Sequence, residues 1–307
     1  MKTAFVFPGQ ASQFVGMGLD LYNSKPIAQK YYDLADELFD FSIKDLSFYG
    51  PLVKLTQTRV TQPAIYVHSM ILFEELKNRG KLPEVVAGHS LGEYSALVAA
   101  GVLDFRQGLG LVKIRAEEMQ RATENNSGTM AAIVGLDYKT VQKVIEKSVI
   151  GGICSIANYN SPTQIVISGD VQSVQSTMLT LKEAGAKRVI ELSVGGAFHS
   201  SLMKSAGETL KKALDSTTFQ QPRCPIYSNV TGTATTDIKE IRNRLYQQLT
   251  SPMLWVQSVE NMIKDGVETF VEVGPGNVLQ GLIKRINGNV IVRGVSRAED
   301  LEKPEWN

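Results

Sequence analysis

Ser90 lies at the centre of a short pattern that can make a serine nucleophilic. Residues 88–92 read Gly-His-Ser-Leu-Gly, a G-x-S-x-G motif between an apolar run and a helical pattern. The glycines allow a sharp turn that lifts the hydroxyl to a helix N-terminus, where free N–H groups stabilise developing negative charge. A Gly-Ser turn without a catalytic role has the same letters, but the strand before it and the helix after it favour a nucleophile.

A serine hydroxyl needs a general base, and the chain has three histidines. His89 adjoins Ser90 in a tight turn, so we expect it to point away and to be structural. His68 lies in a largely apolar helical segment and is expected to be a core residue. His199 follows a glycine pair at the expected start of a helix. By elimination, His199 is the candidate base.

Arg115 is the candidate for binding a charged group. In a long helical pattern it lies beside Leu111 and Met119, at the border of the apolar face. An arginine at such a border needs an anionic partner. From spacing alone, a structural pair with Glu118, Glu93 or another carboxylate is favoured over a contact with substrate.

Composition excludes several classes of function. The chain has 307 residues and a formal net charge of +1, which gives no reason to expect nucleic-acid or membrane binding. No run of about 18 apolar residues occurs, and the N-terminus lacks a signal-peptide pattern, so we expect a cytoplasmic protein. Cys154 and Cys224 belong to no metal-ligand pattern and are expected to be buried thiols; a disulfide is the less favoured alternative.

The elements that must position these residues alternate between strands and helices, which predicts an α/β fold with a mainly parallel sheet. The expected strands are 4–7, 84–87, 225–229, 268–273 and 290–292. The expected helices are 27–39, 64–77, 91–100, 104–123, one that starts near 198, 238–249, 255–265 and 278–286.

The segment 125–192 follows a different order. Its pattern predicts strands at 129–134, 153–158, 164–168 and 188–192, with helices at 138–147 and 171–184. This βαββαβ order is the ferredoxin-like pattern. We therefore expect a small subdomain, 125–192, inserted into a larger domain that comprises 1–124 and 193–307.

Six short motifs occur in a familiar order. They are Phe-Pro-Gly-Gln at 7–10, Thr-Gln-Pro-Ala at 61–64, Gly-His-Ser-Leu-Gly-Glu at 88–93, Arg115, Gly-Ala-Phe-His-Ser at 196–200 and Val-Gly-Pro-Gly at 273–276. With them, the sequence resembles the malonyl-CoA:acyl carrier protein transacylases of bacterial fatty acid synthesis, over nearly the whole chain. The resemblance implies a hydrolase-like α/β core with a mainly parallel sheet plus an inserted ferredoxin-like subdomain.

The resemblance also implies roles for the matching residues. Ser90 would attack a malonyl thioester, and His199 would take its proton and later return one to the leaving thiol. The backbone N–H groups of Gln10 and Leu91 would bind the oxyanion. Arg115 would hold the free malonyl carboxylate as a planar, two-pronged donor.

Further residues would line the site by the same resemblance. Gln62 and Gln248 match polar lining residues, and the backbone carbonyl of Gln248 would orient the histidine in place of a triad carboxylate. Asn158 would line the cleft from the small subdomain. Phe198 would leave no room for an α-methyl group and so favour malonyl over methylmalonyl; simple core packing is the alternative interpretation.

One position departs from the family pattern. Ala11 follows Gln10, where the family usually has glycine. Alanine is acceptable there unless the position needs a positive φ, in which case the oxyanion loop is strained or differently shaped.

The implied reaction moves malonyl from malonyl-CoA to the pantetheine thiol of acyl carrier protein through an ester on Ser90, by a ping-pong route. No cofactor is expected beyond malonyl-CoA as substrate, nor a bound metal, and we expect a monomer. Two alternatives remain open. A serine esterase or thioesterase would use the same Ser90 and His199, with an acidic residue feeding the base. A non-catalytic carrier-protein docking module would keep only the fold.

Overall fold

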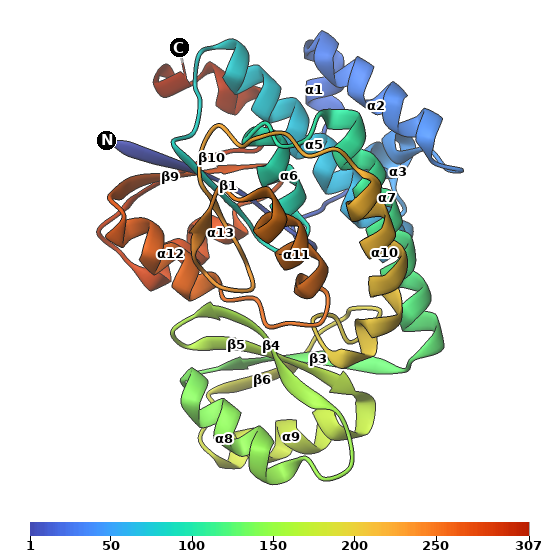
Figure 1. The fold of residues 1–307 in the computed structure, drawn as a ribbon, viewed down its shortest axis with the longest axis vertical. Helices are drawn as coiled ribbons and strands as arrows, with labels where there is room; N and C mark the ends of the chain where they lie inside the picture. The colour runs from blue at the N-terminus through green and yellow to red at the C-terminus, as the bar shows by residue number, and fades with distance from the viewer. Residues whose placement is uncertain (307) are drawn as a thin grey trace.

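The computed structural model describes residues 1–306 and contains two separate β-sheets (Figure 1). The larger sheet has six strands in the order β10-β9-β1-β2-β7-β8. Their bounds are β1 Lys2–Phe7, β2 Val85–Gly88, β7 Ile226–Tyr227, β8 Ala234–Thr235, β9 Val267–Val273 and β10 Ile291–Val295. All neighbouring pairs are parallel except β7 with β8.

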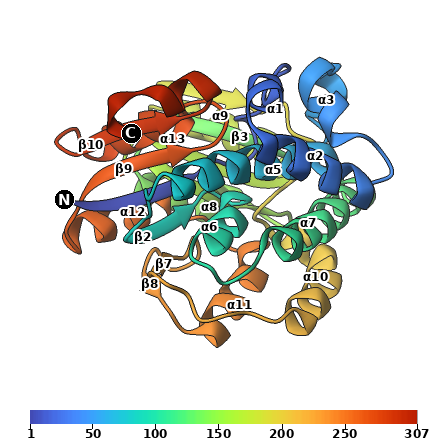
Figure 2. The same cartoon turned by 90° about the horizontal axis from the view of Figure 1, so that it is seen from above.

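Helices cover both faces of this sheet (Figure 2). They are α1 Leu19–Ser24, α2 Pro26–Leu38, α3 Ile43–Tyr49, α4 Leu52–Leu55, α5 Thr58–Asn78, α6 Gly92–Ala99, α7 Phe105–Asn125, α10 Lys204–Ser216, α11 Ile238–Gln248, α12 Trp255–Lys264 and α13 Val278–Ile286, with short 3-10 turns at Ser201–Met203, Ala298–Glu302 and Pro304–Trp306. Alternation along β1 sends Phe5 and Phe7 into the core against α5, and Ala4 and Val6 into a second core against α12 and α13.

The smaller sheet is antiparallel, in the order β4-β5-β3-β6. It consists of β3 Gly128–Val134, β4 Cys154–Ser161, β5 Gln164–Asp170 and β6 Arg188–Glu191, with the helices α8 Tyr138–Ser148 and α9 Val171–Glu183. Both helices cover the face turned away from the larger sheet (Figure 1). The expected fold class, a mainly parallel α/β core plus a βαββαβ unit, is confirmed. The domain boundaries at 124/125 and 192/193 stay a prediction.

The two sheets are joined beside the expected nucleophile. Met253 exchanges backbone hydrogen bonds of 2.8 Å with Ala157 and Tyr159 of β4. From the other side, the His89 ring nitrogen Nε2 lies 2.9 Å from Asn160 Oδ1, also on β4. The edge of the small sheet is therefore fixed to the segments that flank the site.

Some predicted elements differ from the structure. The strand expected over 225–229 pairs only at Ile226–Tyr227. The helix expected near Phe198 begins at Lys204, because His199 has a φ of +56° that a right-handed helix cannot contain. The short helices α1, α3 and α4 were not predicted, since four to seven residues hold too few turns for a clear period.

Two expectations from composition can be compared with the structure. Cys154 and Cys224 are both buried free thiols, and burial raises the pKa of each to about 11. Among residues 1–306, no helix is both long and apolar enough to cross a membrane.

Candidate active site

The turn that carries Ser90 is built by two glycines. A Cβ atom on Gly88 would lie 1.9 Å from the backbone carbon of Gly92, and one on Gly92 would lie 2.0 Å from the carbonyl oxygen of Phe7. Only glycine permits these approaches, so the turn between β2 and α6 can pack against the end of β1. Ser90 takes a φ of +53° and is half-buried at the tip of the turn.

His199, the base candidate left by elimination among three histidines, lies at Ser90. Its Nε2 lies 2.9 Å from Ser90 Oγ, and its Nδ1 lies 2.8 Å from the backbone oxygen of Gln248. Because a carbonyl oxygen only accepts hydrogen bonds, Nδ1 carries the proton and Nε2 is free to accept one from the serine. The geometry is that of a nucleophile with its general base.

The surroundings keep this base neutral. Burial, and then the positive charge of Arg115, lower the pKa of His199 to about 3. The other two histidines are structural, as expected: His89 bonds to Asn160, and the buried His68 places Nε2 2.8 Å from the carbonyl oxygen of Ser296. Burial lowers the pKa of both to about 4.

Arg115 lies beside the nucleophile and is only 1% exposed. Its Nη2 donates to Ser90 Oγ at 2.9 Å and to Gln248 Oε1 at 2.9 Å, while Nη1 donates to Gln62 Oε1 at 2.6 Å. The guanidinium also lies 5.6 Å from the centre of the Tyr94 ring. All of these hydrogen-bond acceptors are neutral.

The structural ion pair that spacing favoured for Arg115 does not form. Glu118 pairs instead with Arg121 at 2.7 Å, and within residues 1–306 no carboxylate lies within ion-pairing distance of Arg115. Its Nε–H is buried and has no hydrogen-bond partner in this part of the chain. A buried guanidinium without an anionic partner is costly, which makes Arg115 a candidate for binding an anion.

The loop before α1 brings Gln10 to the same turn. A Cβ atom on Gly9 would lie 2.3 Å from the carbonyl oxygen of His89, so the loop rests directly on the serine turn. Within the described chain, the backbone N–H groups of Gln10 and Leu91 donate no hydrogen bond, which leaves both available to a ligand. Ala11 has a φ of +81°, so this position does take the left-handed conformation and carries strain.

The strained positions coincide with the site. In residues 1–306 the non-glycine residues with positive φ are Ala11, Ser90 and His199. Such conformations cost of order 1–3 kcal/mol each and persist where the surrounding structure holds them. The packing around this site therefore maintains a geometry that the local chain does not prefer.

The other residues predicted for the site differ in how directly they contact Arg115 and the Ser90–His199 pair. Gln62 and Gln248 hold Arg115 directly, and Phe198 is 6% exposed immediately before His199. Asn158 is 7% exposed on β4. Its position is fixed by the backbone bridge to the segment that follows α11, and its neighbour on the same strand, Asn160, holds His89.

Sequence reasoning missed Asn229. This residue is 1% exposed and follows β7, beside the end of β2. Its Oδ1 accepts the backbone N–H of Ser90 at 2.8 Å, and its Nδ2 donates to the carbonyl of Gly88 at 2.6 Å. Its place after a parallel strand was the available signal, because ligand sites form at that edge of such sheets.

Glu93 was also missed as a member of the site. It lies in the first turn of α6, is 3% exposed and accepts from Gln248 Nε2 at 2.6 Å. Burial raises the pKa of this carboxyl to about 7, against the opposing effect of Gln248, Asn229 and Arg115. The sequence marked Glu93 only as one possible partner of Arg115 and as the last letter of a motif.

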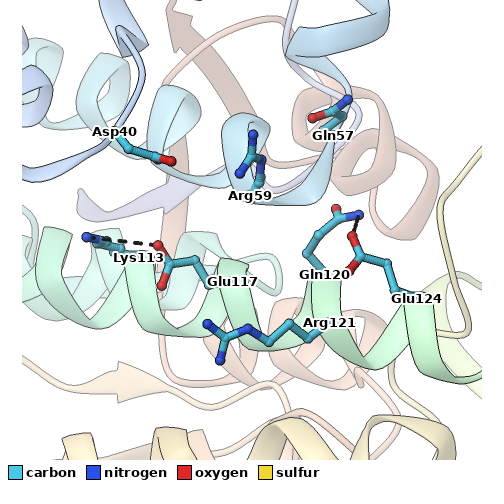
Figure 3. A pocket seen from close by; sticks show the side chains of 8 residues that line it. All are labelled: Asp40, Gln57, Arg59, Lys113, Glu117, Gln120, Arg121 and Glu124. Atoms are coloured by element: carbon cyan, nitrogen blue, oxygen red, sulfur yellow. Dashed lines mark hydrogen bonds and ion pairs between the residues drawn. The ribbon is translucent and has the colours of Figure 1, made fainter.

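A polar cavity of about 550 Å³ lies elsewhere, on the outer face of α7 (Figure 3). The α7 side chains that line it fall on the face opposite Arg115 at 3.6 residues per turn. These side chains largely interact with one another: Lys113 pairs with Glu117 at 3.9 Å, and Gln120 donates to Glu124 at 3.1 Å (Figure 3). The cavity is therefore separate from the Ser90 site.

A serine on a strand-to-helix turn, a neutral histidine at its hydroxyl and a buried cation beside both define a serine-dependent enzyme of acyl transfer. The chain belongs to the acyl transferase domain family, whose pattern matches residues 4–299. It is 43% identical over 302 residues to the malonyl CoA-acyl carrier protein transacylase of Bacillus subtilis. The matched residues make up 98% of this chain and 95% of that protein. The protein of that name from Escherichia coli is 43% identical over 92% of both chains.

Solved structures agree with these relatives. The acyl carrier protein S-malonyltransferase from Vibrio cholerae matches with a TM-score of 0.94 at 40% identity, over 98% of this chain and 99% of that one. A malonyl-transacylase solved in complex with its type II PKS acyl-carrier protein also matches with a TM-score of 0.94, at 37% identity over 98% of both chains.

Proposed function

We propose that this protein transfers malonyl from malonyl-CoA to the phosphopantetheine thiol of acyl carrier protein. The observation that carries the proposal is Arg115, a buried cation without an anionic partner, 2.9 Å from the Ser90 hydroxyl. A malonyl thioester presents a free carboxylate two carbons from the reacting carbonyl, whereas an acetyl thioester presents none. The charge of Arg115 therefore matches the feature that distinguishes malonyl from acetyl.

The first half-reaction forms an ester on Ser90. The Ser90 hydroxyl gives its proton to His199 Nε2 while Oγ attacks the thioester carbonyl, and the backbone N–H groups of Gln10 and Leu91 stabilise the oxyanion. The carbon–sulfur bond then breaks, and the CoA thiolate takes the proton from Nε2. Malonyl-Ser90 and free CoA thiol result.

The second half-reaction reverses these steps with another thiol. The pantetheine thiol of the carrier protein gives its proton to His199, and its sulfur attacks the ester carbonyl. Ser90 Oγ leaves and recovers the proton. One thioester replaces another, so the exchange is close to thermoneutral and runs in both directions by a ping-pong route.

Arg115 also links substrate charge to the base. Its positive charge contributes to the low pKa of His199. A malonyl carboxylate beside the guanidinium offsets that charge and raises the pKa of His199, which makes the imidazole a stronger base. An acetyl group lacks this effect, so the arrangement favours malonyl in catalysis as well as in binding.

Selectivity against a branched substrate comes from Phe198. Its ring is 6% exposed next to the base, where an added α-methyl group would need space. One methyl group in a tight pocket is worth roughly 1–3 kcal/mol. We assign Gln62 and Gln248 to holding Arg115, and Asn158 to the side of the site formed by the small sheet.

The reaction belongs to fatty acid biosynthesis, with acyl carrier protein as the partner and no cofactor beyond the substrate itself. We also propose a cytoplasmic location and a monomeric state for the protein. The esterase alternative expects an acidic residue at His199 Nδ1, but a backbone carbonyl occupies that place. The docking-module alternative gives no reason for a paired Ser90 and His199.

The test uses malonyl-CoA labelled in the malonyl group. The proposal expects acid-stable label on Ser90 that passes to carrier protein, and no label on Ser90→Ala. Release of free malonate without transfer would identify a hydrolase. The absence of any reaction would identify a docking module.

Arg115→Ala separates the role of the guanidinium from that of the Ser90–His199 pair. Malonyl loading should fall by about 100-fold or more, because a charge-assisted contact is lost, while acetyl loading should change much less. An equal loss for both acyl groups would contradict the carboxylate contact.

A further inference from the structure

Glu93 touches the residues that hold the reacting groups, yet it touches no reacting atom itself. Its Oε2 accepts from Gln248 Nε2 at 2.6 Å and from the backbone N–H of Asn229 at 3.4 Å. The side chain is 3% exposed and forms no ion pair within residues 1–306. Burying a carboxyl group is costly, so its retention here needs a reason.

The reason lies in the orientation of the Gln248 amide. An ionised carboxylate only accepts hydrogen bonds, and a guanidinium only donates them. Between Glu93 and Arg115, the amide must therefore present Nε2 to Glu93 and Oε1 to Arg115, as the distances of 2.6 Å and 2.9 Å record. If the amide were reversed, Oε1 would face the carboxylate of Glu93, an acceptor, and Nε2 would face the guanidinium of Arg115, a donor.

The same glutamine also holds the nucleophile and the base. Its Nε2 lies 3.0 Å from the carbonyl oxygen of Ser90, and its backbone oxygen accepts from His199 Nδ1 at 2.8 Å. Gln248 is fully buried. Gln248 therefore contacts Ser90 and Arg115 through its side-chain amide and His199 through its backbone.

Asn229 gives Glu93 a second connection to the serine turn. Its side chain bridges the backbone of Gly88 and Ser90, and its Oδ1 also lies 3.3 Å from Gln248 Nε2. Ser90 needs this support, because its φ of +53° is unfavourable for a serine.

We propose that Glu93 is a positioning residue for malonyl transfer, which acts through Gln248 and Asn229 to hold nucleophile, base and guanidinium in one geometry. The inference rests on the proposed function. It assigns to a buried carboxylate the role of orienting a neutral amide between two charges.

The protonation of Glu93 provides a signature. Its pKa of about 7 means that the carboxylate loses its charge as the pH falls through neutrality, and a protonated carboxyl, which can also donate, no longer restrains the Nε2 end of the amide. The charged group that faces it is Arg115, and the titratable neighbours His199 and Tyr94 have pKa values of about 3 and about 12. Before substrate binds, neither neighbour titrates near 7.

The experiment compares Glu93→Gln with Glu272→Gln. Glu272 is the matched control: it is 1% exposed and accepts from the backbone N–H groups of Leu279 and Gln280, but contacts neither Ser90 nor Gln248. Single-turnover malonylation of Ser90 is measured from pH 5.5 to 9, with the fraction folded checked by circular dichroism.

Glu93→Gln should slow malonylation by about 10- to 100-fold, the range typical when a hydrogen bond that orients a metal-ligating residue is removed. The wild-type rate should fall below about pH 7, and this fall should vanish in Glu93→Gln. Glu272→Gln should keep the wild-type rate and pH profile per folded molecule.

Two further variants keep the test decisive. Glu93→Asp retains the charge and should recover part of the rate, even if Glu93→Gln folds poorly. In a Gln248→Ala background, Glu93→Gln should add little further loss, because its route of action is already absent.

A wild-type rate and pH profile in folded Glu93→Gln, or additive losses in the double variant, would overturn the inference. A wild-type protein that loads malonyl on Ser90 but passes none to carrier protein would instead contradict the proposed function. The two failures are therefore distinguishable.

Discussion

Ala11 holds a left-handed backbone, with a φ of +81°, in the loop that presents the Gln10 amide. For a residue with a Cβ atom this conformation costs roughly 1–2 kcal/mol, and for glycine very little. The loop shape is kept nevertheless, because Ala11 donates to Gln13 Oε1 at 2.8 Å and Ser12 donates twice to the carbonyl of Gly9. The departure from the family pattern thus adds strain to a loop that these hydrogen bonds hold in shape.

Ala11→Gly should therefore raise the free energy of unfolding, by about 0.5–1 kcal/mol after the entropy of the added glycine is subtracted. Chemical denaturation measures it. Ala184→Gly is the matched control, because Ala184 is exposed with a φ of −74° and should lose stability on the same change. A loss for Ala11→Gly equal to that for Ala184→Gly would show that the loop carries no relievable strain.

At the scale of elements, the site depends on helices that start at defined residues. Asp104 caps α7 in a capping box with Gln107, through two side-chain to backbone hydrogen bonds of 2.7 Å and 3.0 Å. The residue at which α7 begins determines which side chains lie on each face of the helix, and Arg115 lies on the face toward Ser90. The start of α6 is set differently. Gly92 begins this helix where it touches the end of β1.

Gly92→Ala should destabilise the protein by several kcal/mol or prevent folding, because its Cβ would lie 2.0 Å from the Phe7 carbonyl oxygen, a backbone atom that cannot move aside cheaply. Gly110→Ala, inside α7 with no atom within 4 Å of the new Cβ, should stabilise by about 0.5–1 kcal/mol. Thermal denaturation of both variants checks the pair, and equal effects would contradict the packing argument.

At the scale of the whole molecule, the buried titratable groups control how stability depends on pH. His68, His89 and His199 have folded pKa values of about 4, 4 and 3, below the unfolded value of 6.5. Below pH 6.5 the unfolded chain binds protons that the folded chain refuses, so each histidine lowers stability as pH falls. Glu93 and Glu272 have raised pKa values, so above pH 4.5 the folded chain binds their protons before the unfolded chain does. Each of them therefore adds stability as the pH falls toward 4.5.

The three histidines outnumber the two glutamates over this range, and each histidine that is not offset is worth about 1.4 kcal/mol per pH unit. The free energy of unfolding should therefore fall by about 2 kcal/mol between pH 6.5 and pH 5. Urea denaturation at the two pH values measures the change. Stability that stays constant or rises on acidification would mean that the histidines are not held neutral in the folded state.

The sequence by itself determined the local features. The G-x-S-x-G turn, the helix that begins at residue 104 and the alternation of strands and helices follow from contacts between residues close in the chain, so periodicity and turn chemistry predict them. The elimination among three histidines found His199 without any knowledge of where it lies. It worked because the chain offers few bases.

Only the tertiary structure decided what those residues meet. Ser90 and His199 are 109 positions apart, and Arg115 and Gln248 are 133 apart. Spacing gave Arg115 a structural carboxylate partner, but the folded chain surrounds it with neutral acceptors instead. Local patterns did not assign Asn229 and Glu93 to the site, because their contacts exist only where the ends of β2, β7 and α11 meet. Packing over long sequence separations, which no local pattern encodes, made this a site.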